Sequence, residues 1–152
     1  VPVTVDRAPL DLVAWAALIA RFARARGVAI HLEPGDYLVK DAGALIAEVN
    51  TVEEKGGTNF AGVNAGFSLQ NLAAYYQTPF VVAPLAITGT STTETVTVAG
   101  HINEAIDLLA EDVDLPPLRE GDYLAFLNAG GYGASSSSNH CMRGAHSEFL
   151  VG

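Results

Sequence analysis

Short segments typical of β-strands, separated by turn residues, fill most of this chain after Tyr37 and constrain its fold more than any other feature. Their apolar residues either alternate with polar ones or form short continuous runs, as in strands that bury one face or both. Gly56-Gly57 is typical of a hairpin turn, and residues 116–122 are typical of a loop that leads into a strand. The predicted strands cover residues 45–52, 60–63, 80–85, 95–98, 123–127 and 148–151. Such a series predicts a closed β-barrel or a β-sandwich.

The first part of the chain has a different pattern. Residues 1–8 alternate like a short strand, and from 11 to 26 apolar residues recur every three or four positions. We therefore expect an amphipathic helix with Asp11 as its N-cap and Gly27 as its stop. A buried strand is expected over residues 28–32. Helix, tight turn and strand together form the closing unit of an α/β layer or barrel, so the fold class is mainly β with an α/β start.

Composition excludes several classes of partner. The net charge is -9, which disfavours nucleic acid and anionic membrane surfaces because both require clustered cations. At 152 residues and 49% hydrophobic content the chain can bury a core as one domain. Its single cysteine, Cys141, is typical of a reducing compartment, and no apolar run is long enough to span a bilayer. We expect a cytoplasmic protein.

Three stretches place tight-turn backbone beside a carboxylate or a phenol: Glu33-Pro34-Gly35-Asp36, residues 100–107, and residues 128–133 with three glycines around Tyr132. Glycine lets the backbone approach a small anionic ligand closely. Each stretch also has an ordinary explanation: a plain turn, a helix start capped by Asn103, and a barrel corner that requires positive φ. No histidine spacing indicates a metal site.

The order of these stretches resembles one enzyme family. Residues 32–39 are similar to the segment LEPGRYLV of the group III (alanine-racemase-fold) pyridoxal-phosphate decarboxylases, and above all of the diaminopimelate decarboxylases. Residues 100–107 resemble the family's GPxCESxD, residues 115–118 its LPPL, and residues 129–139 its AGAYGxSxxSNYN. The likeness extends over residues 9–151.

This resemblance implies a fold, a cofactor and a partner. The family combines an N-terminal (β/α)8 barrel, which carries the lysine that holds pyridoxal phosphate, with a C-terminal β-domain. Residues 1–39 would be the end of that TIM-like barrel, and residues 40–152 an incomplete β-domain. Neither Lys40 nor Lys55 matches the cofactor lysine, so this chain alone should be unable to decarboxylate an amino acid. The rest of the barrel would be its partner within one polypeptide, and the active sites would be shared in a homodimer.

The resemblance also assigns residues to the site. Glu33, Pro34 and Gly35 would line the cofactor phosphate, with Asp36 next to them. Tyr132 would contact both cofactor and substrate, and Tyr76 the substrate. Glu104 would bind the distal ammonium of a small amino-acid substrate across the dimer interface.

Three residues depart from the family pattern. Asp36 replaces the motif's arginine, Leu72 replaces a second substrate-binding arginine, and Asn103 replaces the cysteine that donates a proton. Loss of two bidentate carboxylate partners argues against diaminopimelate as the substrate. His140 and Cys141 are the alternative proton donors. We expect a decarboxylase of amino-acid metabolism with altered substrate recognition; the alternative is a catalytically silent homologue that binds or regulates a partner.

Overall fold

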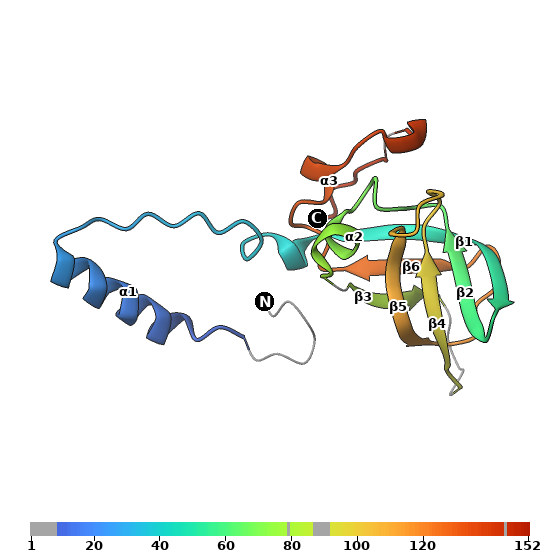
Figure 1. Cartoon of the computed structure of the whole chain (residues 1–152), viewed down its shortest axis with the longest axis horizontal. Coiled ribbons are helices and arrows are strands. Elements are labelled where there is room, and N and C mark those ends of the chain that lie inside the picture. The colour runs from blue at the N-terminus through green and yellow to red at the C-terminus, as the bar shows by residue number, and fades with distance from the viewer. Residues whose placement is uncertain (1–8, 79, 87–91, 145) are drawn as a thin grey trace.

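Strands of one continuous sheet make up the β-domain. The computed structural model describes residues 9–78, 80–86, 92–144 and 146–152, so the expected strand at 1–8 lies outside it. In sheet order β3-β6-β1-β2-β4-β5, the edge strands β3 and β5 lie near each other, and the sheet curls into a nearly closed barrel (Figure 1). The strands are β1 (Ala44–Lys55), β2 (Thr58–Val63), β3 (Val81–Leu85), β4 (Glu94–Ala99), β5 (Leu108–Leu115) and β6 (Tyr123–Leu127).

The strand pairing joins segments that are far apart in the sequence. β1 and β2 form the expected hairpin, with Gly56 and Gly57 at φ 65° and 88°. The last strand, β6, pairs antiparallel with both β1 and β3. β2 pairs parallel with β4, which requires a long crossover, and that crossover contains the short helix α2 (Leu72–Tyr76) and β3.

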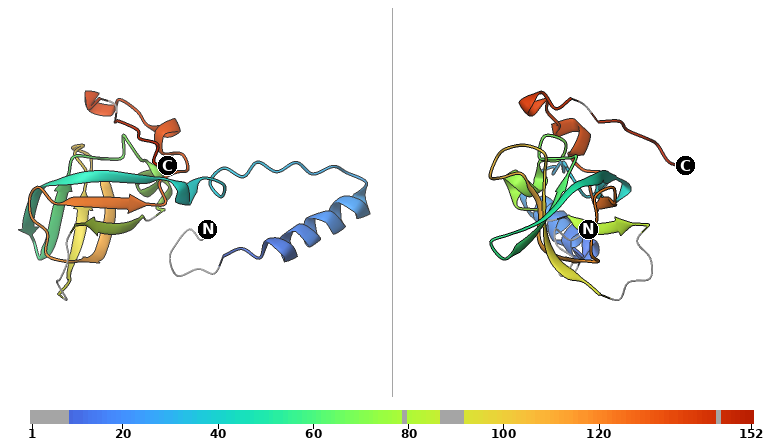
Figure 2. Two further views of the ribbon diagram at one scale, coloured as in Figure 1. Left: turned by 180° about the vertical axis from the view of Figure 1, so that it is seen from behind. Right: turned by 90° about the vertical axis from the view of Figure 1, so that its right-hand side faces the viewer.

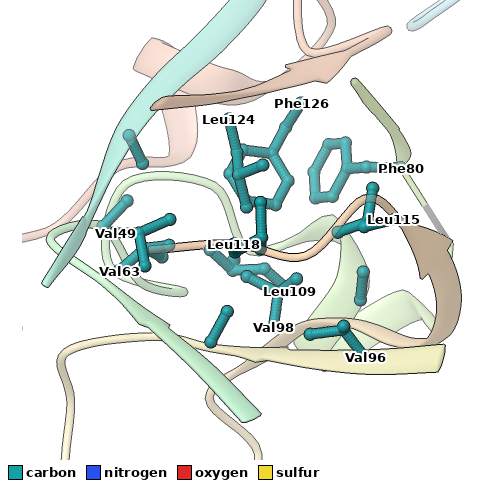
Figure 3. Close-up of a cluster of buried hydrophobic side chains, with 14 of the residues drawn as sticks. Val49, Val63, Phe80, Val96, Val98, Leu109, Leu115, Leu118, Leu124 and Phe126 are labelled. Carbon is teal, nitrogen blue, oxygen red and sulfur yellow. The ribbon is translucent and has the colours of Figure 1, made fainter. Parts of the chain in front are cut away.

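Alternate side chains of these strands form the core (Figure 3). Leu124 and Phe126 of β6 are fully buried and lie opposite Val49, Val63 and Val98 from β1, β2 and β4. Because Leu124 and Phe126 are two residues apart, both side chains lie on the same face of β6. The expectation of a barrel-like β-domain is therefore confirmed.

The helix α1 (Leu12–Arg26) has the predicted caps. Both Val13 and Ala14 donate their N–H groups to the Asp11 carboxylate, at 3.0 and 2.9 Å, and Gly27 has φ 64°. No residue of α1 is buried, and the helix lies away from the sheet (Figures 1 and 2). This helix has no packing partner within the described part of the chain.

Two predicted strands are absent from the structure. Residues 28–32 and 148–151 are exposed and form no strand, because no neighbouring strand of the described chain takes their hydrogen bonds. One strand, β5, was not predicted. The remaining short helices are η1 (Lys40–Ala42), α3 (Gly133–Ser136) and η2 (His140–Met142). In the described part of the chain no helix has the length and apolarity needed to cross a membrane.

Candidate functional site

A cavity of about 350 Å³ lies where the segment before β1, the helix α2 and the loop after β6 meet. Its volume is within the range of small-molecule sites, about 300–1,000 Å³. The residues that line it are Asp36, Lys40, Asn71, Leu72, Tyr76, Thr78, Tyr132 and Ser136. Three residues expected at the site from the sequence, Asp36, Tyr76 and Tyr132, therefore lie around one cavity.

Two of the three glycine-containing stretches contact each other beside this cavity. Gly35 lies so close to Tyr132 that a β-carbon on residue 35 would overlap the phenol hydroxyl. A β-carbon on Gly131 would likewise overlap the Asp36 carboxylate. Both glycines permit close approach and neither has a positive φ, so the positive φ expected of a barrel corner does not fall on Gly131. The left-handed backbone is instead at Asn128 and Tyr132, with φ 61° and 58°.

A partly buried ion pair forms one wall of the cavity. Lys40 Nζ donates to Asp36 Oδ2 at 2.7 Å, and the side chains are 5% and 33% exposed. Lys40 is held from both sides, because its N–H donates to the Asp36 carbonyl and its carbonyl accepts the N–H of Gly130. The other oxygen of the carboxylate, Oδ1, is buried and has no hydrogen-bond donor in the described part of the chain. Lys40 is thus the one charged partner of Asp36 among the described residues.

Residues around α2 complete the wall. The fully buried Gln70 donates to the carbonyl of Ala129 and accepts from the N–H of Leu72, both at 3.3 Å, so it connects α2 to the loop after β6. Ser136 donates to Asn71 Oδ1 at 3.2 Å and strengthens the same connection. Leu72 is 8% exposed and provides an apolar surface where the family resemblance implies an arginine.

The third stretch, residues 100–107, lies apart from the cavity. It is a series of turns between β4 and β5, so the alternative of a helix capped by Asn103 is wrong. Asp107 is buried, and its two oxygens accept the N–H groups of Phe67 and Ile102, each at 2.6 Å. These bonds hold Asn103 and Glu104 at an exposed tip. There His140 Nε2 lies 3.7 Å from Glu104 Oε1.

One histidine near this loop has a perturbed acidity. Burial, followed by the positive charge of Arg143, lowers the pKa of His101 from its ordinary value of 6.5, and the Asp107 carboxylate opposes this effect. The buried Nε2 of His101 has no hydrogen-bond partner among the described residues. Over the same residues, no group of three or more His, Cys, Asp and Glu side chains could hold a metal ion.

The structure therefore divides the predicted site residues into two groups. Gly35, Asp36, Tyr76 and Tyr132 lie together, and Glu33 and Pro34 precede them on an exposed segment. Asn103 and Glu104 form the second group. Sequence reasoning missed Lys40 as a site residue, although an aspartate four positions before a lysine is a detectable signal. It also missed the remaining polar lining residues Asn71, Thr78 and Ser136, for which the sequence carries no signal.

Residues 36–130, which include most of the cavity lining, match the family model described as "Pyridoxal-dependent decarboxylase, C-terminal sheet domain". The chain belongs to this family. It is similar to the diaminopimelate decarboxylases of Methanothermobacter thermautotrophicus and Escherichia coli K12, each at 36% identity. The alignments cover 99% and 85% of the chain but only 37% and 34% of those proteins, so the chain spans about a third of their length.

Solved structures of the decarboxylase family have the same fold. Diaminopimelate decarboxylase from Helicobacter pylori, crystallised with L-lysine, superposes with a TM-score of 0.79 at 25% identity. This match covers 91% of the chain and 34% of that protein. The resemblance inferred from the motifs, to the C-terminal portion of a fold-type III decarboxylase, is confirmed.

Pyridoxal phosphate is the cofactor of the family, and the residues around the cavity fit it. Because Gly35 has no β-carbon, the Tyr132 hydroxyl lies directly against its backbone, which brings a hydrogen-bonding phenol next to the Glu33-Pro34-Gly35 turn. Glu33, Pro34 and Gly35 would hold the phosphate side of the cofactor, and Tyr132 would donate a hydrogen bond to it.

Proposed function

We propose that this chain is the C-terminal sheet domain of a pyridoxal-phosphate-dependent amino-acid decarboxylase with altered substrate recognition. The single observation that carries this proposal is the cavity at which Asp36, Leu72 and Tyr132 meet, most of whose lining falls within the region that matches the decarboxylase family. Residues 1–39 would belong to the N-terminal barrel of the same polypeptide. The exposed apolar residues of α1 support this, because a stripe of this kind is normally buried against a partner.

The cofactor, when bound, supplies the electron sink that accepts the electron pair left by departing CO2. The residues of this chain orient and shield the reactants. The Tyr132 phenol would donate a hydrogen bond to the cofactor. Tyr132 belongs to the loop after β6, and its hydroxyl lies against Gly35. Leu72 contacts the substrate's carbon chain and excludes water from it.

The second group of residues would act across a dimer. Glu104 lies exposed and away from the cavity of its own chain, which supports a role in the site of a second subunit. At Asn103 an amide replaces an acidic proton donor, and an amide cannot serve as a general acid near neutral pH. His140, whose Nε2 lies 3.7 Å from Glu104 Oε1, would provide the proton instead. The lone exposed cysteine supports a reducing compartment, the cytoplasm.

The test is a screen of the complete protein, supplied with pyridoxal phosphate, for CO2 release from diamino, amino-dicarboxylic and amide-bearing amino acids. We expect turnover of at least one of them, together with visible absorbance from bound cofactor. Tyr132→Phe should weaken cofactor binding about tenfold, since one hydrogen bond is lost. Titration of the absorbance with pyridoxal phosphate measures this affinity independently of turnover.

Tyr123→Phe is the matched control. It also removes a phenol hydroxyl, but that hydroxyl lies on β6 and donates to Glu48 at 3.3 Å, outside the cavity. Its cofactor affinity should equal that of the unaltered protein. A complete protein that binds no cofactor and releases no CO2 from any of these amino acids would contradict the proposal and favour a catalytically silent homologue.

A further inference from the structure

The wall that this chain contributes to the cavity carries no net charge. Asp36 and Lys40 are the charged residues of the lining, and they neutralise each other at 2.7 Å. The remaining lining residues are uncharged: an amide, two hydroxyls, two phenols and one leucine, namely Asn71, Thr78, Ser136, Tyr76, Tyr132 and Leu72.

Burial makes this neutralisation hard to undo. The Lys40 side chain is 5% exposed and has a carboxylate partner in direct hydrogen-bond contact, so its ammonium is already satisfied. A ligand carboxylate would have to compete with Asp36 for it. A ligand ammonium would in turn compete with Lys40 for Asp36 Oδ2, since the other oxygen, Oδ1, is buried against Gly131. Either charged group would lose its hydration on entering the cavity without gaining an unpaired counter-charge.

An uncharged polar group faces no such competition. A carboxamide, a hydroxyl or an ester can exchange hydrogen bonds with water for hydrogen bonds with Asn71, Thr78, Ser136 or the phenols. Its aliphatic stem can pack against Leu72, which is 8% exposed. For the distal group of an amino acid, the balance of desolvation and new hydrogen bonds therefore favours an uncharged group over a charged one.

We propose that the Asp36–Lys40 pair determines specificity, and that the pocket selects amino acids whose distal group is uncharged. This inference rests on the proposed function for the identity of the ligand as an amino acid. The sequence-based expectation that Glu104 binds a distal ammonium predicts a different order, with diamino acids bound best.

The experiment compares three amino acids of the same chain length that differ in distal charge: glutamine, glutamate and ornithine. Isothermal titration calorimetry on the complete protein with pyridoxal phosphate gives each dissociation constant without requiring turnover. We expect glutamine to bind roughly tenfold or more tightly than the other two, because a buried charge without a partner is strongly disfavoured. CO2 release, measured separately, tests the proposed function.

Variants of the pair separate its charge from its packing. Asp36→Asn leaves the Lys40 ammonium free and should shift the preference at least fivefold toward glutamate. Lys40→Met leaves the Asp36 carboxylate free and should shift it similarly toward ornithine. The double variant, Asp36→Asn with Lys40→Met, restores a neutral wall and should recover the preference for glutamine. Circular dichroism confirms that each variant is folded.

Several outcomes would overturn the inference. They are tighter binding of glutamate or ornithine than of glutamine by the unaltered protein, equal binding of all three, or no binding of any. If both single variants fold and still prefer glutamine to the same extent, the Asp36–Lys40 pair does not determine specificity. If glutamine is preferred but no CO2 is released, the pocket assignment stands and the proposed decarboxylase function fails.

Discussion

The imidazole of His101 lies in the turn after β4, close to two groups of opposite charge. Burial and the Arg143 guanidinium lower the pKa of this histidine below 6.5, and the Asp107 carboxylate opposes the shift. The folded state therefore binds the His101 proton less readily than the unfolded state does. We expect the free energy of unfolding to stay level above pH 6.5 and to fall as the pH decreases below that value toward the lowered pKa.

Urea unfolding at several pH values, followed by circular dichroism, measures this dependence. His101→Gln should flatten the decrease between pH 6.5 and pH 5, since glutamine does not titrate. His31→Gln is the control, because His31 lies on the exposed segment after α1 and should leave the curve unchanged. An equal slope in the His101 variant and the unaltered chain would contradict the assignment.

At the scale of elements, Asp107 connects two parts of the fold. Its carboxylate accepts the N–H of Phe67, which follows β2, and the N–H of Ile102, which follows β4. Asp107→Asn replaces one acceptor oxygen by an NH2 group that faces a backbone donor. We expect it to lower the free energy of unfolding by about 1–3 kcal/mol, the typical cost of a buried donor left unsatisfied.

Chemical denaturation of the variant tests this loss against Glu111→Gln, an exposed position on β5. The control should stay within about 0.5 kcal/mol of the unaltered chain. Equal stability of the two variants would show that the Asp107 hydrogen bonds contribute little.

Most elements could be predicted from the sequence because their side chains follow a regular period. Asp11 and Gly27 delimit α1, and β6 begins and ends as expected at Tyr123 and Leu127. β5 was missed for a physical reason: Asp112 has a positive φ of 51°, and the pairing with β4 changes register on both sides of Val98. This irregularity interrupts the alternation by which a strand is recognised.

The candidate site was less predictable than the elements. Motif order located Gly35, Asp36, Tyr76 and Tyr132, but the pairing of Asp36 with Lys40 depends on a turn whose shape no residue type dictates. The separation of Glu104 from the cavity depends on how the strands β4 and β5 are arranged in the sheet. It therefore cannot be predicted from the residues next to Glu104.

For the whole molecule, the stability of the sheet should be independent of the first part of the chain. No residue of α1 is buried, and residues 28–35 are exposed. Deletion of residues 1–35 should therefore shift the midpoint of thermal unfolding by no more than about 2 °C, since none of the described residues among them belongs to the buried core. Circular dichroism at a β-sheet wavelength is the suitable measurement. Trp15, the single tryptophan, lies on α1 and does not report on the sheet.

A decrease of more than about 5 °C in the shortened chain would contradict this independence. Deletion of residues 1–8 alone is the matched control, because it keeps α1 and the segment that follows it. The two shortened chains should unfold at the same temperature.

The position of β6 has a consequence for how the protein is made. This strand is the last of the sheet in the sequence, yet it lies between β1 and β3. During synthesis β1 emerges before β6 and keeps one hydrogen-bonding edge uncovered until residues 123–127 have followed it. During that interval the growing chain is exposed to pairing with other chains. A messenger RNA cut short before the codon for Tyr123 would yield a sheet that has lost β6 and, with it, the strand to which β3 pairs.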